Sequence, residues 1–117
     1  MTGGMPLLRP RRPRIVWDEH NLAHIHERGR CDEAEVSDVL FGTCHTSRRE
    51  LLPVPAGATT KWQYFGQTCQ GRFLVVIAEE VVATKENVGG VRPITCWPLS
   101  DRELTRYLAW RRTRKAR

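Results

Sequence analysis

The feature that most restricts the fold is the apolar run RFLVVIAEEV at residues 72–81. A continuous run of this kind predicts a strand that is buried in the centre of a sheet. Partly alternating patterns predict two further strands at 61–68 and 91–97, and residues 44–51 could form an exposed strand. Turn residues separate these segments, as hairpin loops require. The middle of the chain therefore predicts a mostly antiparallel sheet.

Helix signals stand on both sides of this sheet. Asp18 is a typical N-cap for a helix that runs to about residue 28, with Ile25 on its apolar face and His26 at the boundary with the sheet. A second helix is predicted at about 32–40, where Gly42 ends it. A third begins at Ser100, which forms an S-x-x-E capping box with the glutamate three residues later.

Residues 14–17, RIVW, predict one more short strand ahead of the first helix. The predicted order is therefore β-α-α-β-β-β-β-α, an α+β fold with a mostly antiparallel sheet packed by helices. A chain of 117 residues suits a single domain, which we place at 14–112. A flexible basic arm is expected at 1–13 and a basic tail at 113–117.

Charge is divided unevenly along the chain. The net charge is +6, yet residues 1–16 carry +4 and residues 111–117 carry +5, which leaves −3 for the body. The most acidic part of the body is 18–38, with −5. Basic ends favour a polyanion such as nucleic acid, although they could also serve only as solvated, solubilising ends. The acidic helices suggest a second surface for a protein partner.

The longest apolar run, 73–78, has six residues and is too short to cross a membrane as a helix. No apolar segment follows the N-terminal arginines, so a secretory signal is not expected and we predict a cytoplasmic protein. The four cysteines, at 31, 44, 69 and 96, form no C-x-x-C motif. In the cytoplasm they are expected to be free, partly buried thiols.

Neither a metal nor a cofactor is expected. His20 and His24 are one helical turn apart and could share a face with Glu27, but a metal would need a ligand set of the right reach. Solvated helix residues explain the same spacing, so we prefer that interpretation.

Three segments together resemble BrnT-type toxins of bacterial type II toxin–antitoxin systems. They are IVWDEHNLAHIHERGRCDEAEVSDVL, KWQYFGQTCQGRFLVVI and RPITCWPLSDRELTRY, and the likeness covers about residues 14–112. The matching positions are Trp17, Asp18, Asn21, His26, Glu33, Ala34, Val39, Lys61, Gly66, Arg72, Arg92, Ile94, Ser100, Glu103 and Tyr107. The family's arginine at the end of the last strand falls on Trp97, and Pro98 replaces a basic residue.

The resemblance implies a RelE-like fold and a ribosome-independent endoribonuclease that inhibits translation. It also implies RNA as the substrate and a small DNA-binding antitoxin of the ribbon-helix-helix type, in a homodimer or a hetero-oligomer with that antitoxin. Two alternatives stay open. One is an inactive module of the same fold that binds nucleic acid or protein, and the other is a subunit that only binds proteins through its acidic helices.

RNA cleavage of this kind needs a base for the 2′-hydroxyl, positive charge on the phosphorane and an acid for the leaving oxygen. A histidine exchanges protons near neutral pH and suits such work. The candidate catalytic residues are His45, Arg48, Lys61 and Arg92. The candidate RNA-binding residues are Arg49, Arg72, Trp97 and Arg102.

Three of these candidates carry further expectations. Arg48 and Arg49 are neighbours on a strand, so they are expected to point to opposite faces and at most one can serve a given site. Trp97 could stack on a base, as in single-stranded RNA recognition, or could fill the core or contact a partner. Tyr107 lies on the apolar stripe of the last helix and is expected to pack in the core.

Overall fold

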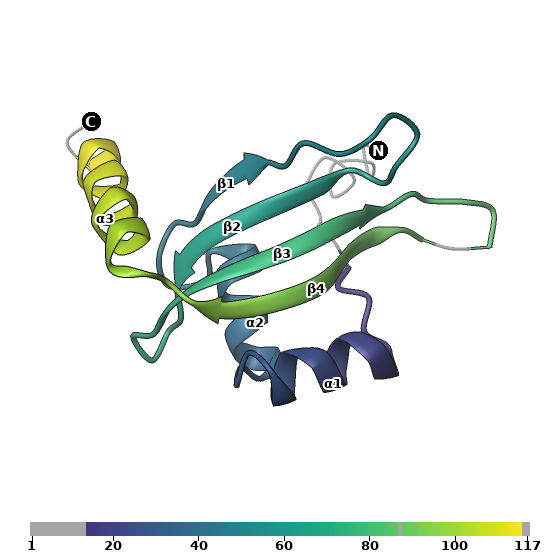
Figure 1. Ribbon diagram of the computed structural model, residues 1–117, viewed down its shortest axis with the longest axis horizontal. Helices are drawn as coiled ribbons and strands as arrows, with labels where there is room; N and C mark the ends of the chain where they lie inside the picture. Colours follow the sequence, from purple (N-terminus) through teal and green to yellow (C-terminus); the bar gives the residue numbers. More distant parts are fainter. Residues whose placement is uncertain (1–13, 87, 116–117) are drawn as a thin grey trace, which may run out of the picture.

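A computed structural model describes residues 14–86 and 88–115 of the chain (Figure 1). It has three helices and four strands within that part of the chain. In chain order these are α1 (Glu19–Glu27), α2 (Glu33–Phe41), β1 (Arg48–Leu51), β2 (Lys61–Gln67), β3 (Phe73–Val81), β4 (Gly90–Pro98) and α3 (Asp101–Lys115). The predicted α+β class and the antiparallel sheet are confirmed.

The four strands form one sheet in the order β1-β2-β3-β4, with every neighbouring pair antiparallel. The apolar run of β3 is an inner strand, as its composition predicts, because such a run needs cover on both faces. Pro98 is the last residue of β4, which is an edge strand. Proline has no backbone N–H to donate, and at this position its absence leaves the hydrogen bonds between the inner strands β2 and β3 intact.

Helices α1 and α2 cover one face of the sheet, as Figure 1 shows below the strands. Leu74, Val76 and Ala78 alternate along β3 and point into this layer, where they are fully buried. They pack against Ile25 of α1 and, from α2, Val36 and Val39. This is the larger of the two hydrophobic clusters that the described part of the chain forms, and it joins both helices to the sheet.

The opposite face of the sheet carries a smaller cluster made with α3. Val75 of β3 and Phe65 of β2 are buried there against Tyr107, which is only 1% exposed. Helix α3 lies beyond the end of the sheet beside the start of β1, at the left of Figure 1. Tyr107 is therefore a core residue, as its place on the apolar stripe of the helix predicts.

Caps define where each helix starts. Asp18 and Asn21 form a capping box at α1, and Asp32 and Glu35 form another at α2. The predicted box at α3 is present, because the Ser100 and Glu103 side chains each accept the other residue's backbone N–H. At the end of α2, Gly42 takes the left-handed conformation with a φ of 60°.

The strand predicted at 14–17 is wrong. Only Ile15 pairs with the sheet, through a single parallel bridge to Val91. The chain cannot continue along β4, because Asp18 immediately begins α1 and the Val16 carbonyl accepts a hydrogen bond from the Asn21 side chain. The observed order is therefore α-α-β-β-β-β-α.

The prediction of four free thiols is also wrong. Cys44 and Cys69 form a disulfide with a Cα–Cα distance of 5.2 Å, and only Cys31 and Cys96 are free and buried. The predicted strand at 44–51 is accordingly shorter, since 44–47 are a loop and β1 starts at Arg48. The left-handed turn at Gly42 leads the chain into this loop, where Cys44 meets the β2–β3 hairpin.

The predicted position of His26 also needs correction. His26 does not lie at the helix–sheet boundary: its side chain is 48% exposed and is 3.5 Å from Glu33. The predicted tail at 113–117 begins inside α3, which extends to Lys115, whereas 116–117 and the arm at 1–13 lie outside the described residues. Within the described residues, no helix is long and apolar enough to span a bilayer.

The disulfide is expected to contribute strongly to stability, because it closes a loop with a sequence separation of 25. Replacing both partners (Cys44→Ser with Cys69→Ser) should lower the free energy of unfolding by about 3 kcal/mol through the greater entropy of the unfolded chain. Urea denaturation monitored by tryptophan fluorescence measures the difference. Wild-type protein kept in reductant is the control and should match the variant, whereas equal stability of the oxidised wild type and the variant would contradict the expectation.

Candidate active site

A pocket of about 310 Å³ lies between the loop after α2 and the C-terminal half of α3. Its lining residues are Cys44, His45, Thr46, Arg111 and Arg114. We call it the His45 pocket. It is the place where the histidine predicted to act in catalysis meets two arginines of α3, residues separated by more than 60 positions in the sequence.

Helix α3 is held against this loop by Tyr107. The buried Tyr107 hydroxyl donates a hydrogen bond of 2.7 Å to the Thr46 carbonyl. One turn later, the Arg111 guanidinium donates a 2.7 Å hydrogen bond to the Gln67 side chain and lies 5.4 Å from the centre of the Tyr107 ring. Arg111 is therefore fixed in position by aromatic and amide contacts before any ligand arrives.

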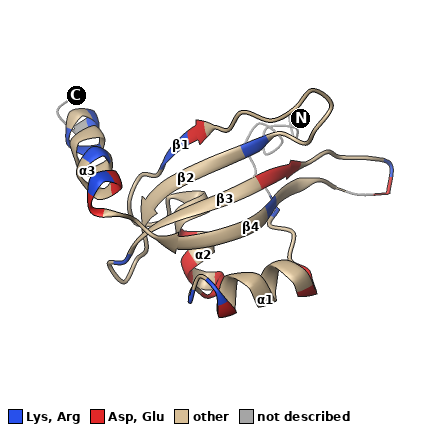
Figure 2. Cartoon of the chain, in the orientation of Figure 1, with Lys and Arg blue, Asp and Glu red and all other residues tan. Residues whose placement is uncertain are grey.

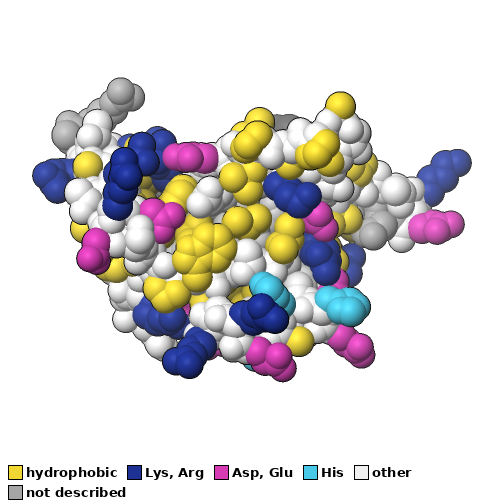
Figure 3. Space-filling view, viewed as in Figure 1, with side chains coloured by type: hydrophobic (Ala, Val, Ile, Leu, Met, Phe, Trp, Pro, Cys, Tyr) yellow, Lys and Arg dark blue, Asp and Glu magenta, His cyan; other side chains and the backbone are white. Residues whose placement is uncertain are grey.

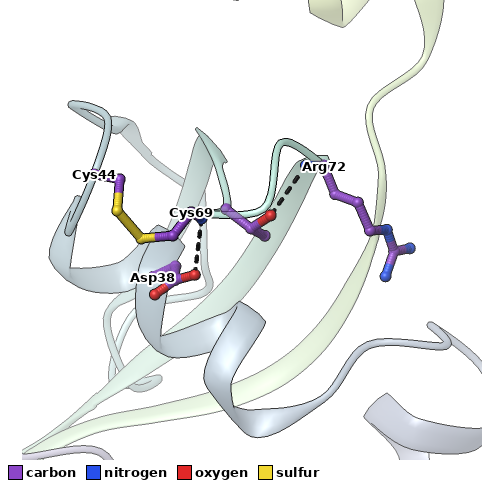
Figure 4. The surroundings of a disulfide bond; sticks show 5 residues. Asp38, Cys44, Cys69 and Arg72 are labelled. Atoms are coloured by element: carbon purple, nitrogen blue, oxygen red, sulfur yellow. Dashed lines mark hydrogen bonds between the residues drawn. A yellow bond between two sulfur atoms is a disulfide. The ribbon is translucent and has the colours of Figure 1, made fainter.

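The loop that carries His45 is fixed from its other side (Figure 4). The disulfide joins Cys44 to Cys69, and the Asp38 carboxylate of α2 accepts the Cys69 backbone N–H at 2.9 Å. The backbone carbonyl of the same Asp38 accepts the Thr43 N–H at 3.1 Å. One helical residue thus holds both chain segments that the disulfide connects, and His45 follows directly after one of the cysteines.

Close packing of the next residues depends on a glycine. The Ser47 hydroxyl donates to the Val39 carbonyl at 2.6 Å, directly above Gly66 of β2. A Cβ at Gly66 would lie 2.5 Å from the Ser47 oxygen, which is closer than real contacts allow. The glycine therefore lets the end of the loop pack onto the sheet.

The His45 pocket is positively charged. No Asp or Glu within residues 14–86 and 88–115 lines it. Arg111 and Arg114 form no ion pair with a carboxylate in the same part of the chain, and Arg114 lies 5.3 Å from the Trp110 ring. Two guanidiniums without a counter-charge, beside an imidazole, are suited to a phosphate group.

Further positive charge lies along α3 outside the pocket. Arg102, Arg106 and Arg112 are exposed on the helix. Figure 2 shows basic residues along most of α3, and Figure 3 shows their side chains gathered on this part of the surface. An extended polyanion that enters the His45 pocket would therefore meet additional cations beside it.

Arg48 does not share this pocket. It lines a separate pocket of about 200 Å³ with Phe65 of the sheet and Arg106 of α3, and its guanidinium is 2.7 Å from the Glu50 carboxylate. Arg49 points to the other face of β1, as alternation along a strand predicts, and lies 4.0 Å from the Trp62 ring.

Lys61 and Arg92 lie at the opposite end of the sheet from the His45 pocket. The register places Lys61 opposite Glu79 and Glu79 opposite Arg92, a row of alternating charge across three strands that Figure 2 shows in blue, red and blue. Arg92 also lies 2.7 Å from Asp18 and 3.4 Å from Glu79. The hydrogen bond to Asp18 raises the pKa of Arg92 despite partial burial, so its charge is matched by two carboxylates.

The other predicted RNA-binding residues are also dispersed. Arg72 bonds the Glu35 carboxylate at 2.8 Å, and in Figure 4 its side chain points away from the disulfide. Trp97 is half-buried in the smaller hydrophobic cluster, opposite Val75 on β3. Arg102 is exposed near the start of α3. Of the eight candidate residues, His45 alone lies in the His45 pocket.

Sequence reasoning missed Arg111 and Arg114 as site residues. Both belong to the segment interpreted as a basic end, although their spacing from Tyr107, four and seven positions, places all three on one face of a helix. This helical spacing is the sequence signal from which both arginines could have been predicted as site residues.

The expected absence of a metal stays a prediction. His20 and His24 line a pocket with Arg92 and Ile94, and the described residues contain no group of three or more His, Cys, Asp or Glu placed to hold a metal. No protein-family model and no curated protein matches the sequence. Function is therefore inferred from the geometry of the sites and from the motifs of the chain.

The ion pair at Arg92 has a consequence at low pH. Hydrogen bonds from Arg92 and from the Asn21 backbone lower the pKa of Asp18 from 3.8 to about 2. A carboxyl group whose pKa is lower in the folded state stabilises the fold above pH 3.8 and loses that contribution as the pH falls through about 2. The Asp18→Asn variant, which keeps an N-cap side chain, should therefore lose less stability than wild type over this interval.

Acid titration of the unfolding midpoint in urea measures the effect. Glu19→Gln removes a neighbouring exposed carboxylate and is the matched control, which should follow wild type. An Asp18→Asn variant with the acid dependence of wild type would contradict the assigned ion pair.

Proposed function

We propose that the protein is a metal-independent endoribonuclease of the toxin type, with its cleavage site in the His45 pocket. The observation that carries this proposal is the meeting of one imidazole and two guanidiniums without a carboxylate partner in a single pocket. These groups can meet the three requirements of RNA cleavage through the 2′-hydroxyl: the imidazole as proton acceptor, the guanidiniums as positive charge for the phosphorane, and the protonated imidazole as the acid.

The chemistry can be assigned to individual groups. The His45 imidazole takes the proton of the ribose 2′-hydroxyl, and the oxygen attacks the adjacent phosphorus. Arg111 and Arg114 stabilise the negative charge that develops on the phosphoryl oxygens, and the Gln67 contact keeps Arg111 in place for this role. Among the described residues that line the pocket, His45 supplies the only imidazole, so its acquired proton is the one available for the leaving 5′-oxygen.

The RNA would be single-stranded at the cleavage point, since the ribose and phosphate must enter a pocket of about 310 Å³. The exposed arginines of α3, with Arg106 nearest to the second pocket, would bind the flanking phosphates. Neither a metal nor another cofactor is required, because the guanidiniums supply the positive charge.

The RelE-like fold and the BrnT-type assignment belong to this proposal. In their support, two helices precede a four-stranded antiparallel sheet and one helix follows it. Asn21, a position of the resemblance, is buried and donates to the Val16 and Pro93 carbonyls, so it connects the N-terminal segment to β4. The proposed partner is a small ribbon-helix-helix antitoxin that blocks access to RNA.

The proposed compartment is the cytoplasm, where the disulfide would experience a reducing environment. Cys44 and Cys69 are both exposed and could exchange with cellular thiols. Reduction would release one of the two restraints on the His45 loop and leave the Tyr107 hydrogen bond in place. Cleavage should therefore be measured in both redox states of the protein.

A second candidate function is an RNA-binding module without catalysis. The observation that favours it is the pairing of predicted catalytic arginines: Arg48 with Glu50, and Arg92 with Asp18 and Glu79. Trp97, at the position of the family's arginine, packs in a hydrophobic cluster. The exposed arginines of α3 would still bind RNA in such a module, so the two functions differ in cleavage alone.

Cleavage of a fluorescent single-stranded RNA by purified protein tests the site. His45→Ala should lower the rate at saturating RNA by about 100-fold or more and leave binding nearly unchanged. Arg111→Ala and Arg114→Ala should each lower the rate at saturating RNA, because both stabilise charge on the phosphorane. Each should also reduce the slope of log K against log salt by about 0.7, the effect of one lost phosphate contact. Gel analysis of products and fluorescence anisotropy measure the two quantities.

Arg112→Ala is the matched control, because it removes the same charge from an exposed position of α3 that does not line the pocket. Its rate at saturating RNA should equal that of wild type. RNA that is bound but left intact by wild type would favour the binding module. Wild-type cleavage rates in the His45→Ala variant would exclude this pocket as the cleavage site.

Induced expression in a bacterial host tests the toxin assignment. Wild-type protein should arrest growth, since RNA cleavage stops translation, and His45→Ala should not arrest it at the same protein level. Colony counts with immunoblotting measure both. Equal growth arrest by wild type and His45→Ala would show that the toxicity does not come from cleavage in the His45 pocket.

A further inference from the structure

The two remaining cysteines lie side by side in the core. Cys31 is in the connection between α1 and α2, and Cys96 is near the end of β4, 65 positions later. Their sulfur atoms are 2.7 Å apart, and Cys31 and Cys96 are 3% and 1% exposed as whole residues. Neither residue contributes to the His45 pocket.

The backbone around this pair leaves little room for another arrangement. A Cβ at Gly29 would collide with the Cys96 carbonyl oxygen, so the connection between the helices runs directly against β4. Arg30 takes a positive φ of 52° between Gly29 and Cys31, and the Cys31 thiol lies 3.2 Å from the Gly29 carbonyl. This tight turn directs Cys31 toward β4.

The two thiols differ in their surroundings. The hydrogen bond with Cys96 lowers the pKa of Cys31 against the effect of burial, and the nearby Arg72 charge acts in the same direction as that hydrogen bond. The same hydrogen bond, together with burial, raises the pKa of Cys96. Both contacts of Cys31 favour its ionised form, and Cys96, whose sulfur is 2.7 Å away, is the thiol positioned to react with it.

We propose that Cys31 and Cys96 are a redox-reactive thiol pair that forms a second, reversible disulfide when the protein meets a peroxide. The Cys31 sulfur attacks one peroxide oxygen, the O–O bond breaks, and the other oxygen leaves as hydroxide and takes up a proton. The Cys96 sulfur then attacks the Cys31 sulfenic acid, so that the S–S bond forms as the S–O bond breaks, and the departing hydroxide takes up the Cys96 proton. Two electrons pass from the sulfurs to the peroxide, which ends as two waters.

The new bond would join parts of the fold that noncovalent packing alone now connects. Cys44–Cys69 connects the α2–β1 loop to the β2–β3 hairpin, whereas Cys31–Cys96 would connect the α1–α2 turn to β4. The neighbour of Cys96 is Trp97, which packs in the cluster with Tyr107. The pair does not depend on the proposed ribonuclease function, because it involves none of that site's residues.

The experiment uses the full chain with Cys44→Ser and Cys69→Ser, which keeps only the pair in question. The protein is treated with hydrogen peroxide, quenched, denatured, alkylated with iodoacetamide and weighed by mass spectrometry. Before oxidation each chain should take up two alkyl groups. After oxidation it should take up none and be lighter than the untreated, unalkylated chain by two hydrogen atoms, and dithiothreitol should restore both reactive thiols.

The matched control adds Cys31→Ser, which leaves Cys96 without its partner and should abolish the loss of two hydrogens within a single chain. Two retained alkylation sites after peroxide, sulfinic acids in place of a cross-link, or a cross-link between chains would each overturn the proposal.

Wild-type protein supplies a second measurement that does not depend on the folding of any variant. Trypsin leaves Cys31 and Cys44 together on the peptide 31–48, with Cys69 on 62–72 and Cys96 on 86–102. Oxidised wild type should therefore yield these three peptides joined, and untreated protein should yield only the first two joined. Recovery of the peptide 86–102 unlinked after oxidation would overturn the proposal.

Discussion

The contact between Tyr107 and the loop at 42–47 positions both halves of the proposed site. The tyrosine ring is buried against the sheet by Phe65 and Val75, and its hydroxyl bonds the Thr46 carbonyl at 2.7 Å. Because Arg111 and Arg114 share a helix face with this ring, the same contact directs both guanidiniums toward His45. The Gln67 hydrogen bond to Arg111 and the aromatic contacts of α3 complete this attachment, so the helix brings charge to the pocket without a carboxylate to hold it there.

Charge pairing distinguishes the predicted arginines from those of the His45 pocket. Arg72 and Arg92 meet carboxylates of other elements, and Arg48 meets Glu50 of its own strand, so all three have less free charge to offer a phosphate. Arg111 is instead held by Gln67 and by aromatic rings, which fix its position and leave its charge available. This difference, more than the number of arginines, favours the His45 pocket as the site of function.

Local patterns were sufficient to predict much of the fold. The apolar run of β3, the cap at Asp18 and the box at Ser100 each depend on residues close together in the sequence, and all are present. The predictions that proved wrong concern segments whose structure depends on contacts with other parts of the chain. Nothing local shows that Cys44 would meet Cys69, and the strand predicted at 14–17 is limited to one bridge because α1 begins directly after it.

The candidate site shows the same contrast between local sequence patterns and contacts that form only in the folded chain. His45 was predicted as a site residue because it is the only histidine outside the first helix, whereas Arg111 and Arg114 were counted with a basic end although α3 continues through them. Arg92 was expected to contact phosphate from its motif alone, and its ion pairs with Asp18 and Glu79 become visible only when three elements meet.

The central claim is that phosphate groups of RNA enter the His45 pocket, and the imidazole signals test it most directly. The chain has four histidines, and three of them, His20, His24 and His26, lie on α1. Titration with a single-stranded RNA whose 2′-hydroxyls are methylated, followed by NMR of the imidazole protons, should shift His45 alone. Shifts of the α1 histidines with an unchanged His45 would place the RNA elsewhere and contradict the account.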